Sequence, residues 1–138
     1  MKPDSAAFSF ERFRIINANI DCENIPESIS VDFIPSGVLI ESEKRFILKF
    51  LFTAKSDNTQ DSTPFISINC EASYVFKDDV TFENVPEYFY SNSIAIAFPY
   101  IRAFVSTITL QANIKPIILP TLNLTALNTL LKKNTVVK

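Results

Sequence analysis

A long and largely apolar stretch of the chain runs from residue 93 to residue 124 and reads SIAIAFPYIRAFVSTITLQANIKPIILPTLNL. If it is helical, apolar residues at three- and four-residue spacings share one face, which must pack against another element; they are Ala97, Ile101, Phe104, Val105, Ile108 and Ala112. A pair of strands is the alternative, because Ile, Val, Thr and Phe dominate here and short apolar runs are ambiguous by periodicity alone. The length of the stretch favours a long helix that covers a sheet.

Pro99 lies inside this stretch. A proline in a helix interior removes one backbone hydrogen bond and costs about 3 kcal/mol or more. The sequence therefore predicts a kink or break at Ile94 to Ala97 and a fresh helical turn that starts near Phe98.

Two segments near the start of the chain alternate with period two. Residues 8–23 alternate in two registers, and the change near Arg12 predicts a strand with a β-bulge. The alternation of residues 29–40 is interrupted by Pro35-Ser36-Gly37. This interruption predicts an edge strand or a bulge, because proline cannot donate to a central ladder.

Two further segments alternate more regularly. Apolar residues share one face of each segment; they are Phe46, Leu48, Phe50, Phe52 and Ala54 in the first, and Ile66, Ile68, Cys70, Ala72, Tyr74 and Phe76 in the second. The other face is polar, as at Lys49 and Glu71. This pattern is typical of an antiparallel sheet covered on one side.

The last part of the chain predicts a second, shorter helix. Leu127, Leu130 and Leu131 form its apolar stripe, and Asn123 or Thr125 can cap its start. Four strands followed by helices predict an α+β fold. We expect a four-stranded antiparallel sheet (strands at about residues 8–76), covered on one face by a long helix and a C-terminal helix (about residues 86–133), in a single domain that spans residues 1–138.

Composition excludes several kinds of chemistry. The chain has no histidine, which removes Ser-His and Cys-His nucleophilic systems and the commonest metal ligand. Its one glycine, Gly37, cannot build a glycine-rich phosphate loop. The carboxylate pairs Asp78-Asp79 and Glu41-x-Glu43 are expected in solvated turns. The sequence therefore predicts a protein that is not an enzyme, with no catalytic residues, metal or cofactor.

Charge and targeting signals predict where such a protein acts. A net charge of −2 and a pI near 5.1 make a nucleic-acid partner improbable. The N-terminal segment lacks the apolar core of a secretory signal, and no run approaches the roughly 18 residues of a membrane span. We expect a cytoplasmic protein whose two cysteines, Cys22 and Cys70, are free.

Two motifs resemble those of a known family, the SecB protein-export chaperones. Phe98-Pro99-Tyr100-Ile101-Arg102 is similar to the Phe-Pro-Tyr-x-Arg of the family's long helix, and Leu122 to Leu127 resembles the start of its last helix. The strand layout agrees, and Cys70-Glu71 stands where the family commonly has the same pair. The resemblance spans roughly Phe8 to Leu131.

The resemblance implies an ATP-independent holdase, a homotetramer built as a dimer of dimers, which binds non-native polypeptide clients in long apolar grooves. Candidate groove residues, each of which could instead be core, are Ile29, Phe33, Ile34 and Val38 on the second strand and Leu127, Leu130 and Leu131 on the last helix. Alternatively, the chain is an interaction subunit dedicated to one partner, such as a component of a toxin-antitoxin system.

The resemblance also implies a docking site for SecA, through carboxylates on the exposed sheet face. Glu23 and Glu71 match this patch, but Asn19 stands where an acid is expected and Asn69 where an apolar residue is. The family's glycine after the long helix is absent, since this chain reads Ala112-Asn113-Ile114-Lys115-Pro116 there.

Within the motif of the long helix, two side chains carry structural expectations. For Arg102 we expect a salt bridge or a helix-end contact, because arginine is rarely buried unpaired. For Tyr100 we expect a role as a core or interface anchor.

Overall fold

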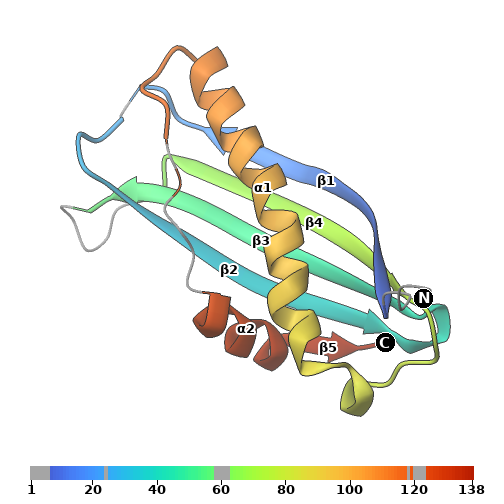
Figure 1. Cartoon of the computed structure of the whole chain (residues 1–138). Helices are drawn as coiled ribbons and strands as arrows, with labels where there is room; N and C mark the ends of the chain where they lie inside the picture. The colour runs from blue at the N-terminus through green and yellow to red at the C-terminus, as the bar shows by residue number, and fades with distance from the viewer. Residues whose placement is uncertain (1–6, 24, 58–62, 118, 120–123) are drawn as a thin grey trace, which may run out of the picture.

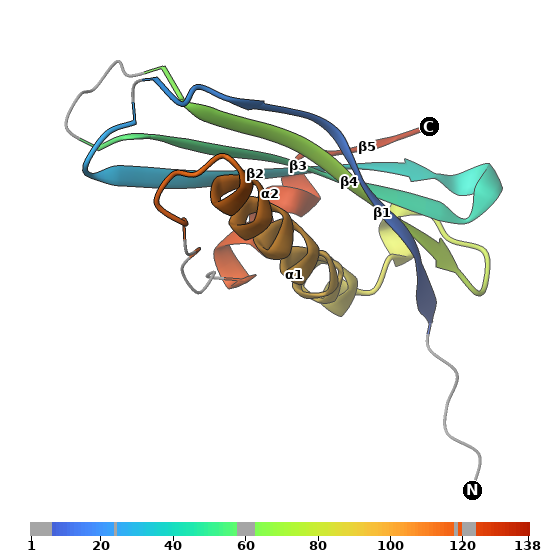
Figure 2. The same ribbon diagram turned by 90° about the horizontal axis from the view of Figure 1, so that it is seen from above.

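The computed structural model describes residues 7–23, 25–57, 63–117, 119 and 124–138. It is an α+β fold in which two helices cover one face of a sheet (Figures 1 and 2). The elements, in chain order, are β1 (Phe8–Ile20), β2 (Ile29–Ile40), the 3-10 turn η1 (Glu41–Glu43), β3 (Arg45–Ser56), β4 (Ile66–Phe76), the 3-10 turn η2 (Phe82–Asn84), α1 (Glu87–Gln111), α2 (Leu124–Lys133) and β5 (Thr135–Val137).

The sheet has five strands in the order β1-β4-β3-β2-β5. Strands β1 to β4 pair antiparallel as predicted, but β5 pairs parallel to β2, so the expectation of a four-stranded antiparallel sheet was wrong. The three residues of β5 are too few to show a period in the sequence. They are a strand because α2 delivers them to the outer edge of β2.

Strand β1 contains two register shifts, one between Phe10 and Arg12 and one between Ile15 and Asn17. The first confirms the β-bulge predicted near Arg12. An extra residue in one strand shifts the alternation of the residues that follow it. The apolar residues after the bulge therefore point to the helix side of the sheet, as those before it do. Phe8, Phe10, Phe13 and Ile15 therefore all pack against the core.

Strand β2 is continuous through Pro35, which pairs in register with Phe50 of β3, so the predicted interruption and the bulge were wrong. The alternative of an edge strand is confirmed at Pro35, because β5 pairs only with Gly37 to Leu39. Proline is tolerated there because of the direction of its backbone groups. The side-chain Nδ2 of Asn134 donates to the carbonyl oxygen of Pro35 at 3.2 Å, from the side opposite to β3. In a strand the N–H and C=O of one residue point the same way, so the N–H that proline lacks is not needed by the β2–β3 ladder.

Helix α1 runs unbroken from Glu87 to Gln111 with Pro99 inside it, so the break predicted at Ile94 to Ala97 was wrong. The hydrogen bond that Pro99 cannot make would reach the carbonyl of Ala95. Both residues lie on the exposed side of α1, where water can satisfy that carbonyl.

The FPYIR motif joins α1 to two separate strands of the sheet, β1 and β2. Residues two positions apart on a helix are separated by about 200° around its axis, so Phe98 and Tyr100 project in nearly opposite directions. The ring of Phe98 packs edge-on against Phe33 of β2 at 5.5 Å between centroids. The ring of Tyr100 stacks on Phe10 and Phe13 of β1, each at 5.3 Å. Tyr100 is 47% exposed and therefore not a core residue, so its role as an interface anchor stays a prediction.

The arginine of the motif behaves differently. Arg102 is exposed and forms no ion pair within the described part of the chain. The salt bridge expected for it is therefore not found there.

The core beneath the first turn of α1 is aromatic. Phe89 is fully buried, and the rings around it lie 4.8 to 5.9 Å away between centroids; they are Phe8, Phe46, Tyr74, Phe76 and Tyr90. The hydroxyl of Tyr74 donates to the carbonyl of Ser93, and burial raises the pKa of Tyr74 well above its ordinary value. The cluster joins α1 to β1, β3 and β4.

Helix α1 is also long and apolar enough to cross a membrane by length and composition alone, so the expectation that no run approaches the length of a membrane span was wrong. The core helix of a soluble protein passes the same test. Here its buried residues face the sheet; they are Phe89, Tyr90, Ser93, Ile94, Ala97, Ile101, Val105 and Thr109.

Gly37 lies where β2, β3 and β5 meet. It pairs with Thr135 of β5, and a Cβ built on it would come within 2.4 Å of Cζ of Phe46 and 2.9 Å of Oγ1 of Thr135. The absence of a side chain thus lets the ring of Phe46 and β5 approach the same point.

Helix α1 ends in a Schellman motif. Asn113 has a φ of 60°, its N–H donates to the carbonyl of Leu110 at 3.1 Å, and the N–H of Ile114 donates to the carbonyl of Thr109 at 3.2 Å. Asparagine thus occupies the left-handed position that glycine usually takes at a helix end. The segment Ala112 to Pro116 thus ends α1 in a Schellman motif without a glycine.

We predict that Asn113→Gly leaves the free energy of unfolding unchanged or raises it by up to about 1 kcal/mol, because glycine adopts this backbone conformation at no steric cost. The matched change Asn113→Ala should lower it by about 1 kcal/mol. Urea unfolding followed by circular dichroism measures both. Equal destabilisation by the two variants would show that the side chain of Asn113, and not its backbone, matters.

Candidate functional site

An open groove of about 560 Å³ lies between the start of β2 and the segment that follows α1. Its lining is mainly apolar, with one acidic and one basic residue; the residues are Ile25, Pro26, Glu27, Ile29, Val31, Phe65, Ile114, Lys115, Pro116 and Ile117. The groove therefore offers an apolar surface of the kind that takes side chains of another chain.

The groove exists because the helices cover only part of the sheet. Ile29, Val31 and Phe33 alternate on the helix side of β2, but only Phe33 lies under α1, through its contact with Phe98. Neither helix crosses the first residues of β2 (Figure 1). Pro26 and Pro116 lie in the irregular segments that border the groove, where proline disfavours regular structure.

The edge of β2 beside the groove has backbone groups that are without a partner among the described residues. Pro35, Gly37 and Leu39 all direct backbone groups away from β3, towards Asn134 and β5. By the alternation of a strand, the N–H and C=O groups of Ile29, Val31 and Phe33 point to the same outer edge. No described residue bonds to them there. An apolar groove and an open strand edge thus lie side by side.

The groove residues predicted from the sequence are dispersed by the structure. Ile29 lines the groove. Phe33, 8% exposed, and Leu131, fully buried, belong to the core, whereas Leu127 and Leu130 are half-buried on α2.

Ile34 and Val38 lie on the opposite face of the sheet, because they alternate with the buried residues of β2. The prediction placed them in one groove with Ile29 and Phe33, although neighbouring residues of a regular strand point to opposite faces. No register shift occurs in the β2–β3 pairing. The role of the predicted groove residues as a set stays a prediction.

Several lining residues were not predicted, among them Ile25, Val31, Phe65, Ile114 and Ile117. Val31 carries the same alternation as Ile29 and could have been found with it. The others lie in segments without a period, so only the proximity of isoleucines to prolines, as in Ile25-Pro26 and Pro116-Ile117, marks them as apolar residues outside regular structure.

The two carboxylates of the predicted SecA patch are not brought together. Oε1 of Glu71 accepts from Arg14 Nη2 at 2.7 Å and Nε at 2.8 Å, and the Glu71 side chain is only 17% exposed. Glu23 is exposed beyond the end of β1. Ile20 pairs with Ile66, the first residue of β4, which lies about 16 Å along the strand from Glu71. Glu23 lies beyond this end of β4.

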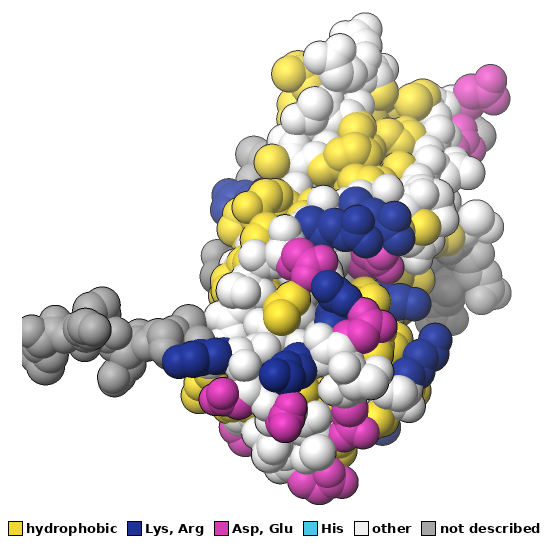
Figure 3. All heavy atoms as spheres, turned by 90° about the vertical axis from the view of Figure 1, so that its right-hand side faces the viewer, with side chains coloured by type: hydrophobic (Ala, Val, Ile, Leu, Met, Phe, Trp, Pro, Cys, Tyr) yellow, Lys and Arg dark blue, Asp and Glu magenta, His cyan; other side chains and the backbone are white. Residues whose placement is uncertain are grey.

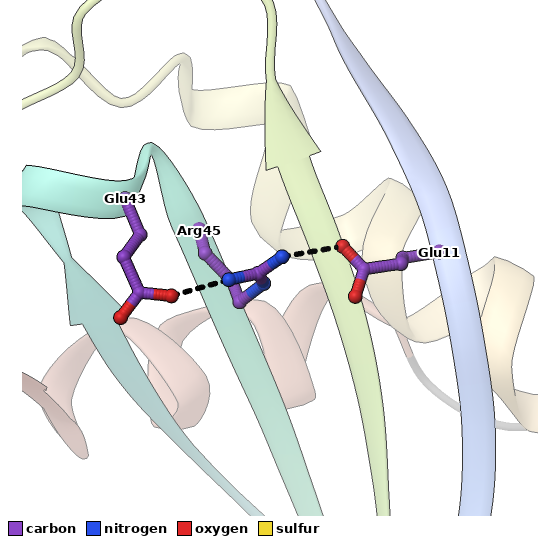
Figure 4. A network of polar contacts seen from close by, with 3 residues as sticks. All are labelled: Glu11, Glu43 and Arg45. Carbon is purple, nitrogen blue, oxygen red and sulfur yellow. Dashed lines mark hydrogen bonds and ion pairs between the residues drawn. The ribbon is translucent and has the colours of Figure 1, made fainter.

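The polar face of the sheet instead carries paired charges. Arg45 contacts the carboxylates of Glu43 and Glu11, the latter at 2.9 Å (Figure 4). Its hydrogen bond to Glu11 and the charge of Glu11 raise the pKa of Arg45 above its ordinary value. Figure 3 shows acidic and basic side chains interleaved on one side of the molecule, beside an apolar area. Carboxylates that are already paired offer less to a basic partner.

The two asparagines that differ from the family pattern, Asn19 and Asn69, also lie on this face or at its edge. Nδ2 of Asn69 donates to Oδ1 of Asn17 across β4 and β1 at 2.9 Å. Asn19 pairs with Ser67 in the same ladder and is exposed. Neither position adds negative charge to the sheet face.

Among the described residues, no group of three or more His, Cys, Asp or Glu side chains is placed to hold a metal ion. The cysteines are free thiols: Cys22 is exposed, and Cys70 is buried in β4. Burial raises the pKa of Cys70 to about 12, against an ordinary value of 9.0.

We predict that an alkylating reagent modifies Cys22 in the folded protein at least about a hundredfold faster than Cys70, because Cys22 is exposed, whereas Cys70 is buried and burial raises its pKa to about 12. Mass spectrometry after timed labelling measures the two rates, with Cys22→Ser as the control that leaves one thiol. The thiol ionises near 9 when unfolded but near 12 when folded, so the free energy of unfolding should fall as pH rises between these values. Fast labelling of Cys70 without unfolding would contradict its burial.

Comparison with known proteins supports the fold. No family model matches the chain. A relative in Methanocaldococcus jannaschii, the uncharacterized protein MJ0357, is 29% identical over 131 residues, which cover 88% of this chain and 82% of the relative.

Among solved structures, the chain is similar to the SecB-like chaperone Rv1957 of Mycobacterium tuberculosis, with a TM-score of 0.67 and 17% identity over 85% of this chain and 91% of that one. That structure is a complex with a ChAD peptide from the HigA1 antitoxin, Rv1956. The likeness confirms the SecB-like fold implied by the FPYIR motif.

Proposed function

On the basis of this SecB-like fold, we propose that the chain is a chaperone of the SecB-like type, which holds non-native polypeptide without ATP, enzymatic chemistry or a cofactor. The observation that carries the proposal is the apolar groove beside the open edge of β2. We propose that it acts in the cytoplasm, on clients that have not reached their folded state.

The groove can hold many sequences because it uses contacts that every extended chain can make. The N–H and C=O groups of Ile29, Val31 and Phe33 can pair with the backbone of a client, which is the same in all polypeptides. Apolar client side chains can then cover Ile29, Val31 and Phe65, at about 25 cal/mol for each Å² removed from water. No catalytic group is required for such binding.

We also propose the homotetramer, a dimer of dimers, that the sequence resemblance implies. The side of α1 that faces away from the sheet exposes large residues, among them Tyr88 and Leu110. Large apolar side chains that are exposed on one side of a helix are candidates for contact with another subunit. Packing between α1 helices of different subunits would bury this second side.

A function dedicated to one partner is the second candidate. The observation that favours it is the structural neighbour Rv1957, which is bound to a peptide from an antitoxin. Docking of SecA at Glu23 and Glu71 stays a prediction with less support, since Glu71 is paired with Arg14 and the described sheet face carries basic residues beside it.

We predict that the protein suppresses aggregation of two unrelated denatured proteins at near-stoichiometric amounts, with a mass of about four chains on a sizing column. Light scattering during dilution of each client from denaturant measures the first property. Protection of one client alone, or of neither, would favour the dedicated partner and contradict the general holdase.

We further predict that Ile29→Ser weakens client binding by about fivefold or more, because burial of an isoleucine side chain contributes about 1 to 2 kcal/mol. The matched control Ile34→Ser removes an isoleucine of the same strand from the opposite face of the sheet, where it is 44% exposed, and should leave client affinity unchanged. Fluorescence anisotropy with a labelled, permanently unfolded client measures both affinities. Equal effects of the two changes would place the binding surface elsewhere.

A further inference from the structure

The outer edge of β2 is divided between two uses. Its first half, at Ile29 to Phe33, has no described backbone partner and borders the groove. Its second half, at Gly37 to Leu39, is occupied by β5 of the same chain. The two halves form one continuous row of outward-pointing N–H and C=O groups.

The occupied half is held mainly by backbone hydrogen bonds. Gly37 N–H donates to Asn134 C=O at 3.2 Å, Lys138 N–H donates to Leu39 C=O at 2.8 Å, and Glu41 N–H donates to Lys138 C=O at 3.3 Å. The side chain of Asn134 adds the bond to the carbonyl of Pro35. These groups would bond equally well to the backbone of any extended peptide.

Side-chain burial contributes little to the attachment of β5. Val136 is 55% exposed and Val137 is 46% exposed. By contrast, Leu131 in the preceding helix is fully buried, so α2 is fixed to the core independently of β5. The pairing spans three residues, Thr135 to Val137. Such a short strand can leave the edge without disturbing the packing of α2.

We infer that β5 is a built-in competitor for the edge of β2: it covers the half of this edge that does not border the client groove, and an extended client segment displaces it to pair along the whole strand. This inference rests on the proposed function, since it regulates the same binding surface. It assigns to Asn134 the role of a positioning residue that holds β5 against β2, through its bonds to Pro35 and Gly37.

The ladder provides a matched pair of proline variants. The bonds of Asn134 and Lys138 to β2 show that the even-numbered residues of this segment direct their backbone groups towards β2. Val136 therefore donates its N–H on the β2 side, and the N–H of Val137 points away from β2. Val136→Pro removes a ladder bond, whereas Val137→Pro introduces the same residue without that loss.

The probe is a fluorescein-labelled peptide of about a dozen residues in which leucine and phenylalanine alternate with serine, the pattern of an extended client. Fluorescence anisotropy gives its affinity for the full chain and for each variant. We expect Val136→Pro to bind it about fivefold or more tightly than the unchanged protein, Asn134→Ala to change affinity in the same direction, and Val137→Pro to leave it unchanged. Circular dichroism confirms that each variant is folded.

Hydrogen exchange of the unchanged protein tests the same inference without a substitution. Saturation with the peptide should speed exchange of the amides of residues 136 and 138, because β5 leaves the edge, while it slows exchange at Ile29, Val31 and Phe33.

The outcomes separate the two levels of the argument. Peptide binding with unchanged or slower exchange in β5, or equal affinities for Val136→Pro and Val137→Pro, overturns the inference and leaves the proposed function intact. An absence of peptide binding to the unchanged protein and to all variants overturns the proposed function, and the inference with it. Binding only to Val136→Pro and Asn134→Ala supports both.

Discussion

The aromatic contacts of Phe89 determine how the two layers of this fold meet. Its ring joins the first turn of α1 to Phe8, Phe46 and Phe76 on three strands, and aromatic pairs of this kind contribute about 0.5 to 1.5 kcal/mol each beyond their buried area. With this end fixed and the FPYIR motif holding its middle, α1 must cross the strands obliquely (Figure 1). One corner of the sheet, at the start of β2, is then left without a helix above it, and the groove lies there.

The sequence predicts those parts of the fold that repeat with a period. The alternation in β3 and β4, the bulge near Arg12 and the helical spacing of Ala97, Ile101 and Val105 were sufficient to predict four strands and the long helix of an α+β fold. The breaks predicted from Pro99 and Pro35 were wrong for one physical reason. A proline disrupts structure only where its missing N–H is needed, and both prolines turn that position towards the outside of their element.

The candidate site was harder to predict because it is made of what lies between the elements. Ile29 was found from its strand, but Ile114 and Ile117 lie in an irregular segment, and their approach to β2 depends on where α1 ends. The loss of Ile34 and Val38 from the predicted set has the opposite cause. A strand without a register shift sends consecutive residues to opposite faces, whatever their hydrophobicity. The likeness to Rv1957 concerns the fold, whereas the boundary of the groove follows from the edge of β2.

Gly37 connects the interior of the molecule to that edge. The ring of Phe46 approaches it within the core, and Thr135 approaches it from β5, each into the space that a side chain would fill. The volume available to one of these groups therefore depends on the position of the other. A change of rotamer at Phe46, deep among the aromatic residues, would alter how closely the last strand can sit against β2. The packing of Phe46 in the core and the position of β5 at the strand edge are thus linked, because both groups use the space that a Cβ of residue 37 would occupy.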